Sequence, residues 1–233
     1  LEEPIPIKPT AHYSMGGIHT DINGLTSIEG IYAAGEAGCV SVYGVNRLGG
    51  NSLLDILVFG RRAGNYVLEY ARHNDFQPVP KNVLEPAEAC IKELMDGDSE
   101  ETMAQIRNDL GNLMSEKAGI YRNATDLTTA VEGLTELRER YKRLKVQDKS
   151  KVFNTELVAA LELGSLLDLA EIVAIGALER TESRGAHSRE DFPKRDDDNW
   201  LQHTVVTRGS DQRPVLNYEP VTITRFQPQA RTY

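Results

Sequence analysis

The chain contains 233 residues, of which 40% are hydrophobic, 26% are charged and 6% are aromatic. This length suffices for one large globular domain or two modest ones, and the composition argues against extended disorder. The formal net charge of −9 argues against the broadly basic surface that binds nucleic acid, so we expect no nucleic-acid partner. The cysteines, Cys39 and Cys90, stand far apart with no CxxC pair. We therefore expect neither a disulfide framework nor a metal site.

The sequence lacks the marks of a membrane-spanning or secreted chain. No apolar run approaches the ~18 to 20 residues of a membrane span. The first ten residues, LEEPIPIKPT, have neither the basic region nor the apolar core of a signal peptide, and they read like the middle of an extended connection. We expect a fragment of a longer protein, in which any membrane association is made through a partner.

Residues 1–60 are rich in glycine and in short apolar or β-branched segments, which predict short strands and turns. The clearest of these segments are residues 16–22, 31–36 and 39–44. An apolar run with helical spacing follows and predicts a helix from about Asn51 to about Arg72. Residues 74–86 then carry three prolines and predict a linker.

Four stretches with helical periodicity follow the linker. They are residues 87–97, 99–122, 124–145 and 154–185. Ser99 is the expected N-cap of the second stretch. The third carries one apolar stripe on a charged helix. The members of this stripe are Leu127, Val131, Leu134, Leu137 and Tyr141. The fourth is apolar nearly all round, so it should be the buried member of a helical bundle, with Gly185 as its stop.

The end of the chain changes character again. Residues 186–200 are polar and irregular, whereas residues 203–207 and 215–226 have the β-branched and aromatic content of strands. The whole pattern predicts an α+β chain with a helical middle and a small terminal ribbon.

One loop has the composition of a ligand site. Gly49 and Gly50 are followed by Asn51 and Ser52, which open the predicted helix. Unpaired backbone N–H groups and the helix dipole at such an N-terminus favour an anionic or oxygen-rich ligand. Arg47 stands just before this loop and could pair with a carboxylate in bidentate fashion, although a surface ion pair is an equally good interpretation.

Two further side chains are weaker candidates. Glu36 ends the predicted strand 31–36, where a carboxylate can accept from the hydroxyls of a cofactor, but a solvated turn is the commoner outcome. His12 precedes a Met-Gly-Gly turn and could bind an anionic substrate, although a lone histidine is more often structural.

The segment from Arg180 to Asp197 interleaves basic and acidic residues. A solvated, self-paired charge run is the favoured interpretation, and a charged docking surface or a brace against the first domain is the alternative. Glu182 and Asp191 are not accompanied by a cluster that would hold a metal. The chain also has no GxGxxG fingerprint, no P-loop and no GxSxG motif.

Three segments stand in a recognisable order. They are HYSMGGI at 12–18, GIYAAGEAGCVSVYGVNRLGGNSLLDILVFGRRAG at 30–64, and ESRGAHSREDFPKRDD at 182–197. Together they resemble the flavoprotein subunit of succinate dehydrogenase and fumarate reductase, from about Pro4 to the end of the chain. The resemblance implies the C-terminal portion of an FAD-binding α/β domain at 1–76. A three-helix-bundle-like domain at 84–190 and a terminal tail with short strands at 191–233 would follow.

The resemblance also implies roles for single residues. The turn formed by Gly50, Asn51, Ser52 and Leu53 would bind FAD, with the backbone N–H groups of Ser52 and Leu53 against the flavin. Glu36 would bind hydroxyls of the cofactor. His12 and Arg47 would bind a carboxylate of the dicarboxylate substrate, and Arg47 would orient it for hydride transfer.

The sequence departs from the family pattern at several points. Tyr43 stands where the family usually has histidine, so the role of that histidine cannot be transferred. The dinucleotide fingerprint, the histidine that attaches FAD and the capping-domain arginine have no counterpart among these residues.

The function implied by the resemblance is interconversion of succinate and fumarate with FAD. Electrons would pass through an iron–sulfur subunit, and a membrane anchor subunit would hold the complex at the cytoplasmic side of a membrane. We expect the fragment alone to be inactive. One alternative is an L-aspartate oxidase-like flavoenzyme, which shares the His-Tyr, Gly-Glu and Asn-Arg motifs. Another is a non-catalytic module whose bundle and charged tail dock on an iron–sulfur subunit.

Overall fold

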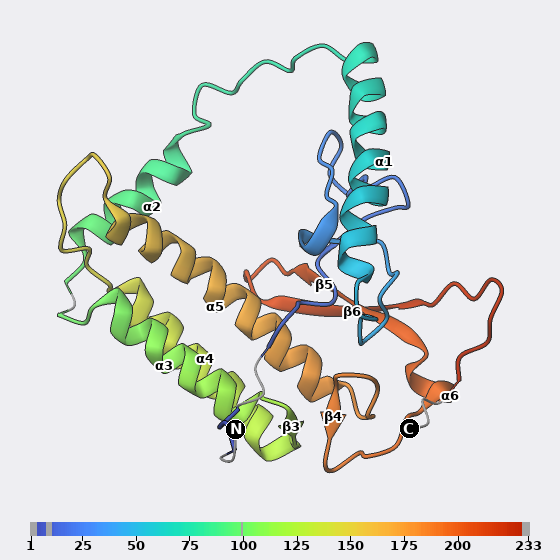
Figure 1. The fold of residues 1–233 in the computed structure, drawn as a ribbon. Coiled ribbons are helices and arrows are strands. Elements are labelled where there is room, and N and C mark those ends of the chain that lie inside the picture. The colour runs from blue at the N-terminus through green and yellow to red at the C-terminus, as the bar shows by residue number, and fades with distance from the viewer. Residues whose placement is uncertain (1–3, 8–10, 99, 230–233) are drawn as a thin grey trace. The chain divides into compact units, whose positions relative to one another are not determined.

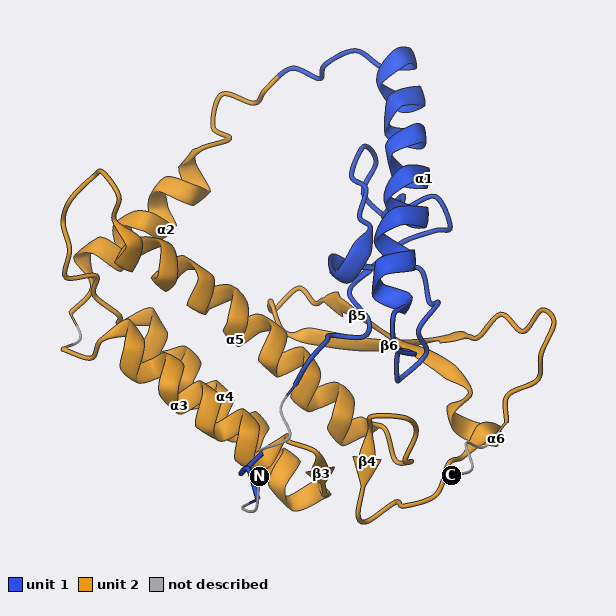
Figure 2. Cartoon of the chain, in the orientation of Figure 1, with its two compact units in different colours: residues 1–78 blue, residues 79–233 orange. Residues whose placement is uncertain are grey.

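The computed structural model describes residues 4–7, 11–98 and 100–229 of the chain (Figure 1). The chain divides into two compact units, residues 1–78 and residues 79–233 (Figure 2). The division falls inside the proline-containing segment 74–86. The four helical segments predicted after the linker and the terminal strands all belong to the second unit. Within the described residues, no helix is long and apolar enough to cross a membrane.

The first unit has very little sheet. Strand β1 (Ile18–His19) pairs in parallel with β2 (Gly38–Cys39), and an isolated antiparallel bridge joins Leu25 to Tyr32. The prediction of a strand over residues 31–36 is wrong, because the chain turns at Gly35 (φ 74°) into the 3-10 helix η1 (Gly35–Ala37). Glu36 therefore lies in a tight turn and not at the end of a strand.

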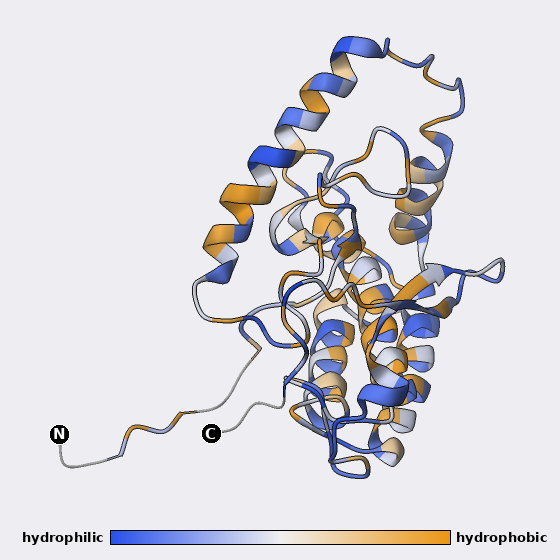
Figure 3. Cartoon of the chain, turned by 90° about the vertical axis from the view of Figure 1, so that its right-hand side faces the viewer, coloured by the Kyte–Doolittle hydropathy of each residue, from blue (hydrophilic) through white to orange (hydrophobic). Residues whose placement is uncertain are grey.

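Helix α1 (Asn51–His73) confirms the predicted helix almost to the residue. Gly50 caps it in the left-handed conformation (φ 81°), which glycine adopts without steric cost. Only Asp55 and Ala63 are buried on this helix. The apolar side chains of its first turns are exposed, and Figure 3 shows these turns as hydrophobic.

The second unit is built on a helical bundle. Helices α3 (Met103–Lys117), α4 (Ala124–Lys142) and α5 (Thr155–Glu179) pack against one another, and α2 (Glu85–Asp96) also contacts α5. Three members of the apolar stripe predicted on α4, Leu127, Leu134 and Leu137, are buried in the core. The other two members, Val131 and Tyr141, pack against it. The periodicity of the sequence therefore identified the buried face of α4 correctly.

The helix ends show where local prediction was less accurate. Thr102 caps α3 in a capping box with Gln105, whereas Ser99, the predicted cap, lies outside the described residues. The prediction that α5 runs to Gly185 is wrong, since the helix ends at Glu179. Gly185 (φ 58°) instead forms the turn in which Arg184 and His187 exchange backbone hydrogen bonds.

Small strands complete the second unit. β3 (Tyr121–Arg122) pairs in parallel with β4 (Ser188–Arg189), and the short helix α6 (Asp197–Trp200) leads into the terminal ribbon. In this ribbon β5 (Gln202–Arg208) pairs antiparallel with β6 (Pro214–Pro220), in the register Val205 opposite Asn217. The predicted strand 215–226 is too long, because pairing ends at Pro220. Helices and separate small sheets make this an α+β chain.

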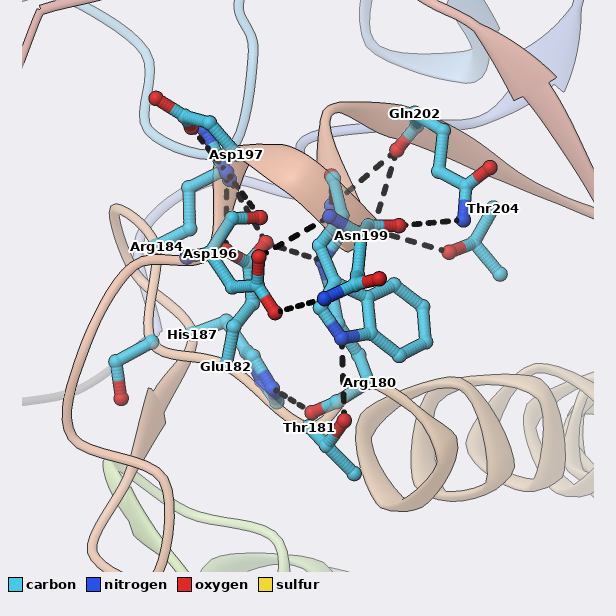
Figure 4. Close-up of polar contacts among 12 residues, drawn as sticks. Arg180, Thr181, Glu182, Arg184, His187, Asp196, Asp197, Asn199, Gln202 and Thr204 are labelled. Carbon is cyan, nitrogen blue, oxygen red and sulfur yellow. Dashed lines mark hydrogen bonds and ion pairs between the residues drawn. The ribbon is translucent and has the colours of Figure 1, made fainter.

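Several of the charged residues that follow α5 are buried, whereas others, such as Glu190 and Lys194, are exposed. Glu182 is 0% exposed and Arg189 is 1% exposed. The Glu182 carboxylate accepts hydrogen bonds from Nε of Arg180 at 3.0 Å and Nε of Arg184 at 2.7 Å (Figure 4). Nη1 of Arg189 donates to the Ala177 carbonyl at 2.9 Å, one of the last carbonyls of α5. The segment is self-paired, as the favoured interpretation expected, but it is not solvated throughout. Glu182 and Arg189 are buried because they satisfy neighbouring charges and the free carbonyls at the helix end.

Candidate functional site

The N-terminus of α1 forms one side of the candidate site. The N–H of Asn51 donates to the Leu48 carbonyl at 3.2 Å, and the N–H of Leu53 donates to the Gly50 carbonyl at 3.1 Å. The N–H of Ser52 makes no hydrogen bond to another described residue. A Cβ at Gly49 or Gly50 would meet no atom within 4 Å, so this side of the loop is open. One of the two predicted amide donors, that of Ser52, is thus available to a ligand, whereas that of Leu53 already has a partner within the turn.

Arg47 lies beside this helix end, and its guanidinium is held over an aromatic ring. Its Cζ is 4.4 Å from the centroid of the Tyr13 ring, at the distance of a cation–π contact. Its Nη1 donates to the Leu48 carbonyl at 3.2 Å. Its Nε is buried and has no hydrogen-bond partner, and no carboxylate of the described residues pairs with it. The surface ion pair considered for Arg47 is therefore wrong, and donors of the guanidinium remain for an external anion.

The Tyr13 ring that contacts Arg47 belongs to a chain of hydrogen bonds formed by two tyrosine hydroxyls and a carboxylate. Tyr43 donates its hydroxyl hydrogen to Oδ2 of Asp55, which is only 5% exposed on the inner face of α1. The hydroxyl oxygens of Tyr13 and Tyr43 are 3.1 Å apart, and the two rings meet edge to face with centroids 5.5 Å apart. Burial, together with hydrogen bonding to Asp55, raises the pKa of Tyr43, so its hydroxyl keeps its proton.

Glu36 contacts the segment 12–14, which also contains Tyr13. Its Oε1 accepts a hydrogen bond from the backbone N–H of Ser14 at 2.9 Å. His12 stands two residues before Ser14 and is exposed. The segment 12–14 is thus attached to Arg47 through Tyr13 and to Glu36 through Ser14. The structure thereby links the segment that begins at His12 to Glu36 and Arg47, two candidates far from it in sequence.

The sequence pattern does not identify every residue of this site. It gives no role to Tyr13, Ser14 or Asp55, and it marks Tyr43 only as a departure from the family pattern. A signal for Asp55 was present, because it is the one charged residue in the apolar run from Leu53 to Phe59. A lone carboxylate in such a run either breaks the core or has a buried partner.

The donors at this site suit an oxygen-rich cofactor better than a metal ion. The open glycine turn, the free N–H of Ser52 and the exposed carboxylate of Glu36 offer both donors and acceptors at one helix end. Among the residues that the structure describes, no group of three His, Cys, Asp or Glu side chains could hold a metal ion.

Comparison with sequence families matches most of the chain. A family model described as fumarate reductase flavoprotein C-term matches residues 107–233. A model described as an FAD binding domain matches residues 2–53, which include all of the candidate site but Asp55. The match of the first model extends over more than half of the chain.

Curated relatives match over nearly the full chain. The fumarate reductase flavoprotein subunit of Mycobacterium tuberculosis is 47% identical over 239 residues, covering 99% of this chain and 41% of that relative. The succinate dehydrogenase flavoprotein subunit of Coxiella burnetii is 43% identical over 244 residues, covering 99% of this chain and 41% of that relative. The chain thus spans about two fifths of the length of these relatives.

Solved structures agree with the sequence comparison. An Escherichia coli quinol fumarate reductase is similar with a TM-score of 0.92 and 43% identity, over 98% of this chain and 40% of that one. The Mycobacterium smegmatis Sdh1 complex in the apo form is similar with a TM-score of 0.84 and 36% identity, over 92% of this chain and 37% of that one. On the family models, the relatives and the shared fold, this chain belongs to the family of fumarate reductase and succinate dehydrogenase flavoprotein subunits.

Proposed function

We propose that this chain takes part in the interconversion of succinate and fumarate within an FAD-dependent flavoprotein. Residues 1–76 would contribute the C-terminal portion of the FAD-binding domain, and the helical segments that follow would form a bundle domain of the same subunit. FAD supplies the two-electron redox chemistry when it is bound. The family membership supports this reaction class, and the geometry around Arg47 supports the substrate class.

The observation that carries the proposal is the Arg47 guanidinium, whose buried Nε has no hydrogen-bond partner. A buried N–H without a partner is costly, so natural structures rarely leave one without a role. The Arg47 side chain is already oriented by Tyr13, and no carboxylate of the described residues neutralises it. A planar guanidinium in this state is well suited to bind one carboxylate of a dicarboxylate through two parallel hydrogen bonds. His12, at the exposed start of the same loop, would bind the same substrate.

The cofactor would lie at the N-terminus of α1. The Ser52 N–H and the positive end of the helix dipole would stabilise negative charge on the flavin ring, and Gly50 and Asn51 would leave room for its approach. The free oxygen of Glu36 would accept from cofactor hydroxyls while the other oxygen holds Ser14. Leu53 would line the cofactor site as part of the same turn, although its N–H already donates to the Gly50 carbonyl.

The proposed partners follow from the same family membership. An iron–sulfur subunit would carry electrons to or from the flavoprotein, and a membrane anchor subunit would hold the complex at the cytoplasmic side of a membrane. The flavoprotein itself would then be peripheral, attached through these subunits.

Two measurements test the proposed function. The first adds FAD to the flavoprotein that contains this chain, removes free cofactor by desalting and records the visible flavin absorbance. The second adds fumarate to the reduced, FAD-loaded protein and follows flavin reoxidation. We expect retained flavin and fumarate-dependent reoxidation, and retained flavin without any response to fumarate would disprove the substrate assignment.

A matched pair of variants locates the cofactor contact. Glu36→Ala should lower the fraction of flavin retained after desalting, because it removes the carboxylate at the helix end. Glu29→Ala removes an exposed carboxylate from the same unit and should retain flavin like the unchanged protein. Equal retention in both variants would remove Glu36 from the cofactor site.

A further inference from the structure

The hydrogen bonds of Tyr43, near the proposed substrate-binding Arg47, run in a definite direction. Tyr43 has a single hydroxyl hydrogen, and it is donated to the carboxylate of Asp55. The Tyr43 oxygen can therefore only accept from Tyr13, so Tyr13 is the donor in the 3.1 Å contact between the two hydroxyls. The chain of donors runs in one direction, from Tyr13 through Tyr43 to Asp55.

This direction affects the Tyr13 ring, which the Arg47 guanidinium contacts. A hydroxyl that donates towards a carboxylate becomes more electron-rich, and successive hydrogen bonds reinforce one another. The negative face of the Tyr13 ring is strengthened as a result, and that face attracts the guanidinium of Arg47 at 4.4 Å. The edge-to-face contact with Tyr43 also fixes the plane of the Tyr13 ring.

The last acceptor of this hydrogen-bond chain, Asp55, is buried on a helix. Asp55 is 5% exposed and lies on α1, whose first turn also carries the open N–H of Ser52. The same helix would thus position both a ligand at its N-terminus and an anion bound to Arg47. Positioning from a helix is more accurate than positioning from a loop alone.

We propose that Tyr43 and Asp55 are positioning residues that hold Tyr13, and through it the Arg47 guanidinium, in the orientation that receives a carboxylate of the substrate. This inference rests on the proposed function, since it requires that Arg47 binds a dicarboxylate. It assigns a role to Tyr43, the position at which the sequence departs from the usual family pattern.

The test measures binding of malonate to the FAD-loaded flavoprotein that contains this chain. Malonate has two carboxylates with one carbon between them, so it cannot undergo the succinate–fumarate interconversion and reports binding alone. Tyr43→Phe should weaken malonate binding about tenfold while flavin content and the melting temperature of the holoprotein change little. Tyr70→Phe makes the same chemical change on a tyrosine of α1 that lies outside this chain of hydroxyls, and this variant should bind malonate normally.

A double-mutant cycle separates positioning from general structural damage. If Tyr43 acts through Arg47, then Tyr43→Phe should cause no further loss of malonate binding in an Arg47→Gln background. An additive loss in the double variant would overturn the inference, because Tyr43 would then act independently of Arg47. Asp55→Asn keeps an acceptor oxygen for Tyr43 but removes the charge, so it should weaken binding about threefold and provides a second, milder variant.

The outcomes for the inference and for the proposed function differ. If Arg47→Gln weakens malonate binding and Tyr43→Phe does not, the positioning role is overturned and the substrate assignment of Arg47 stands. If Arg47→Gln itself leaves malonate binding unchanged, both the substrate assignment and the positioning role are wrong.

Discussion

The carboxylate of Glu182, which is fully buried, accepts a hydrogen bond from Nε of Arg184 at 2.7 Å. The same oxygen accepts from Nε of Arg180 at 3.0 Å, and the second oxygen accepts from the backbone N–H of Asp196 at 2.9 Å. One anion therefore compensates two guanidinium groups at the end of α5. Charges buried in this way depend on one another for their stability.

Glu182→Gln should destabilise the second unit by about 3–5 kcal/mol, because it leaves two arginines without their buried anion. Urea unfolding followed by the fluorescence of Trp200 measures this, since Trp200 is the single tryptophan and its Nε1 donates to the neighbouring Thr181 hydroxyl. Glu139→Gln breaks an exposed pair with Lys142 and should cost below about 1 kcal/mol. Equal effects of the two variants would contradict the role assigned to Glu182.

The stability of the second unit should fall as the pH drops below about 6.5, the ordinary pKa of histidine. His187 is buried, its Nδ1 lies 3.0 Å from Nη1 of Arg122, and its Nε2 lies 3.1 Å from the Arg180 carbonyl. Nδ1 must therefore accept and Nε2 must donate, so the folded state holds the neutral ring. Burial, and to a lesser degree the arginines around it, lower the pKa of His187. Below about pH 6.5, His187 therefore binds a proton in the unfolded chain but stays neutral in the folded chain.

His187→Gln should remove this part of the pH dependence, because glutamine does not titrate. The measurement is the free energy of unfolding from urea titrations between pH 7.5 and about 5, where one such group contributes a slope of at most about 1.4 kcal/mol per pH unit. His73→Gln, on the exposed end of α1, leaves the contacts of His187 intact and serves as the control. An unchanged slope in the His187 variant would show that other groups cause it.

Arg47→Lys should lower kcat/KM for fumarate roughly 10²-fold in the FAD-loaded flavoprotein. An ammonium group retains the charge but cannot form the two parallel hydrogen bonds of a guanidinium. Steady-state kinetics with fumarate measure the loss, and Arg61→Lys, an exposed position on α1, is the matched control. Near-normal turnover in the Arg47 variant would remove this residue from the substrate site.

Gly50→Ala should weaken the start of α1, whereas Gly49→Ala should change little. Both glycines face open space, but Gly50 has a φ of 81°, where an alanine is strained by about 1–2 kcal/mol. Hydrogen exchange of the amides in the first turns of α1 would detect the difference. Similar exchange in the two variants would mean that the turn relaxes without penalty.

The helices could be predicted because their signals are local. Alternation of apolar residues every three or four positions is sufficient to place α1 and the buried stripe of α4, since one face of each helix must meet a core or a neighbour. The ends were harder to predict. The stop of α5 at Glu179 depends on Arg189, which returns from ten positions later to bind the free carbonyls of the helix.

The sequence by itself determined the helical periodicity, the α+β class and the membership of the family, because these depend on neighbouring residues and on long ordered motifs. It also singled out Arg47, Glu36 and His12 as candidates for binding, a role that stays a prediction. Only the tertiary structure decided that Tyr13, Tyr43 and Asp55 form one chain of hydrogen bonds beside Arg47. The physical reason is that a hydrogen bond or a cation–π contact requires atoms within a few ångströms, and no local pattern specifies which distant side chains folding brings to that distance.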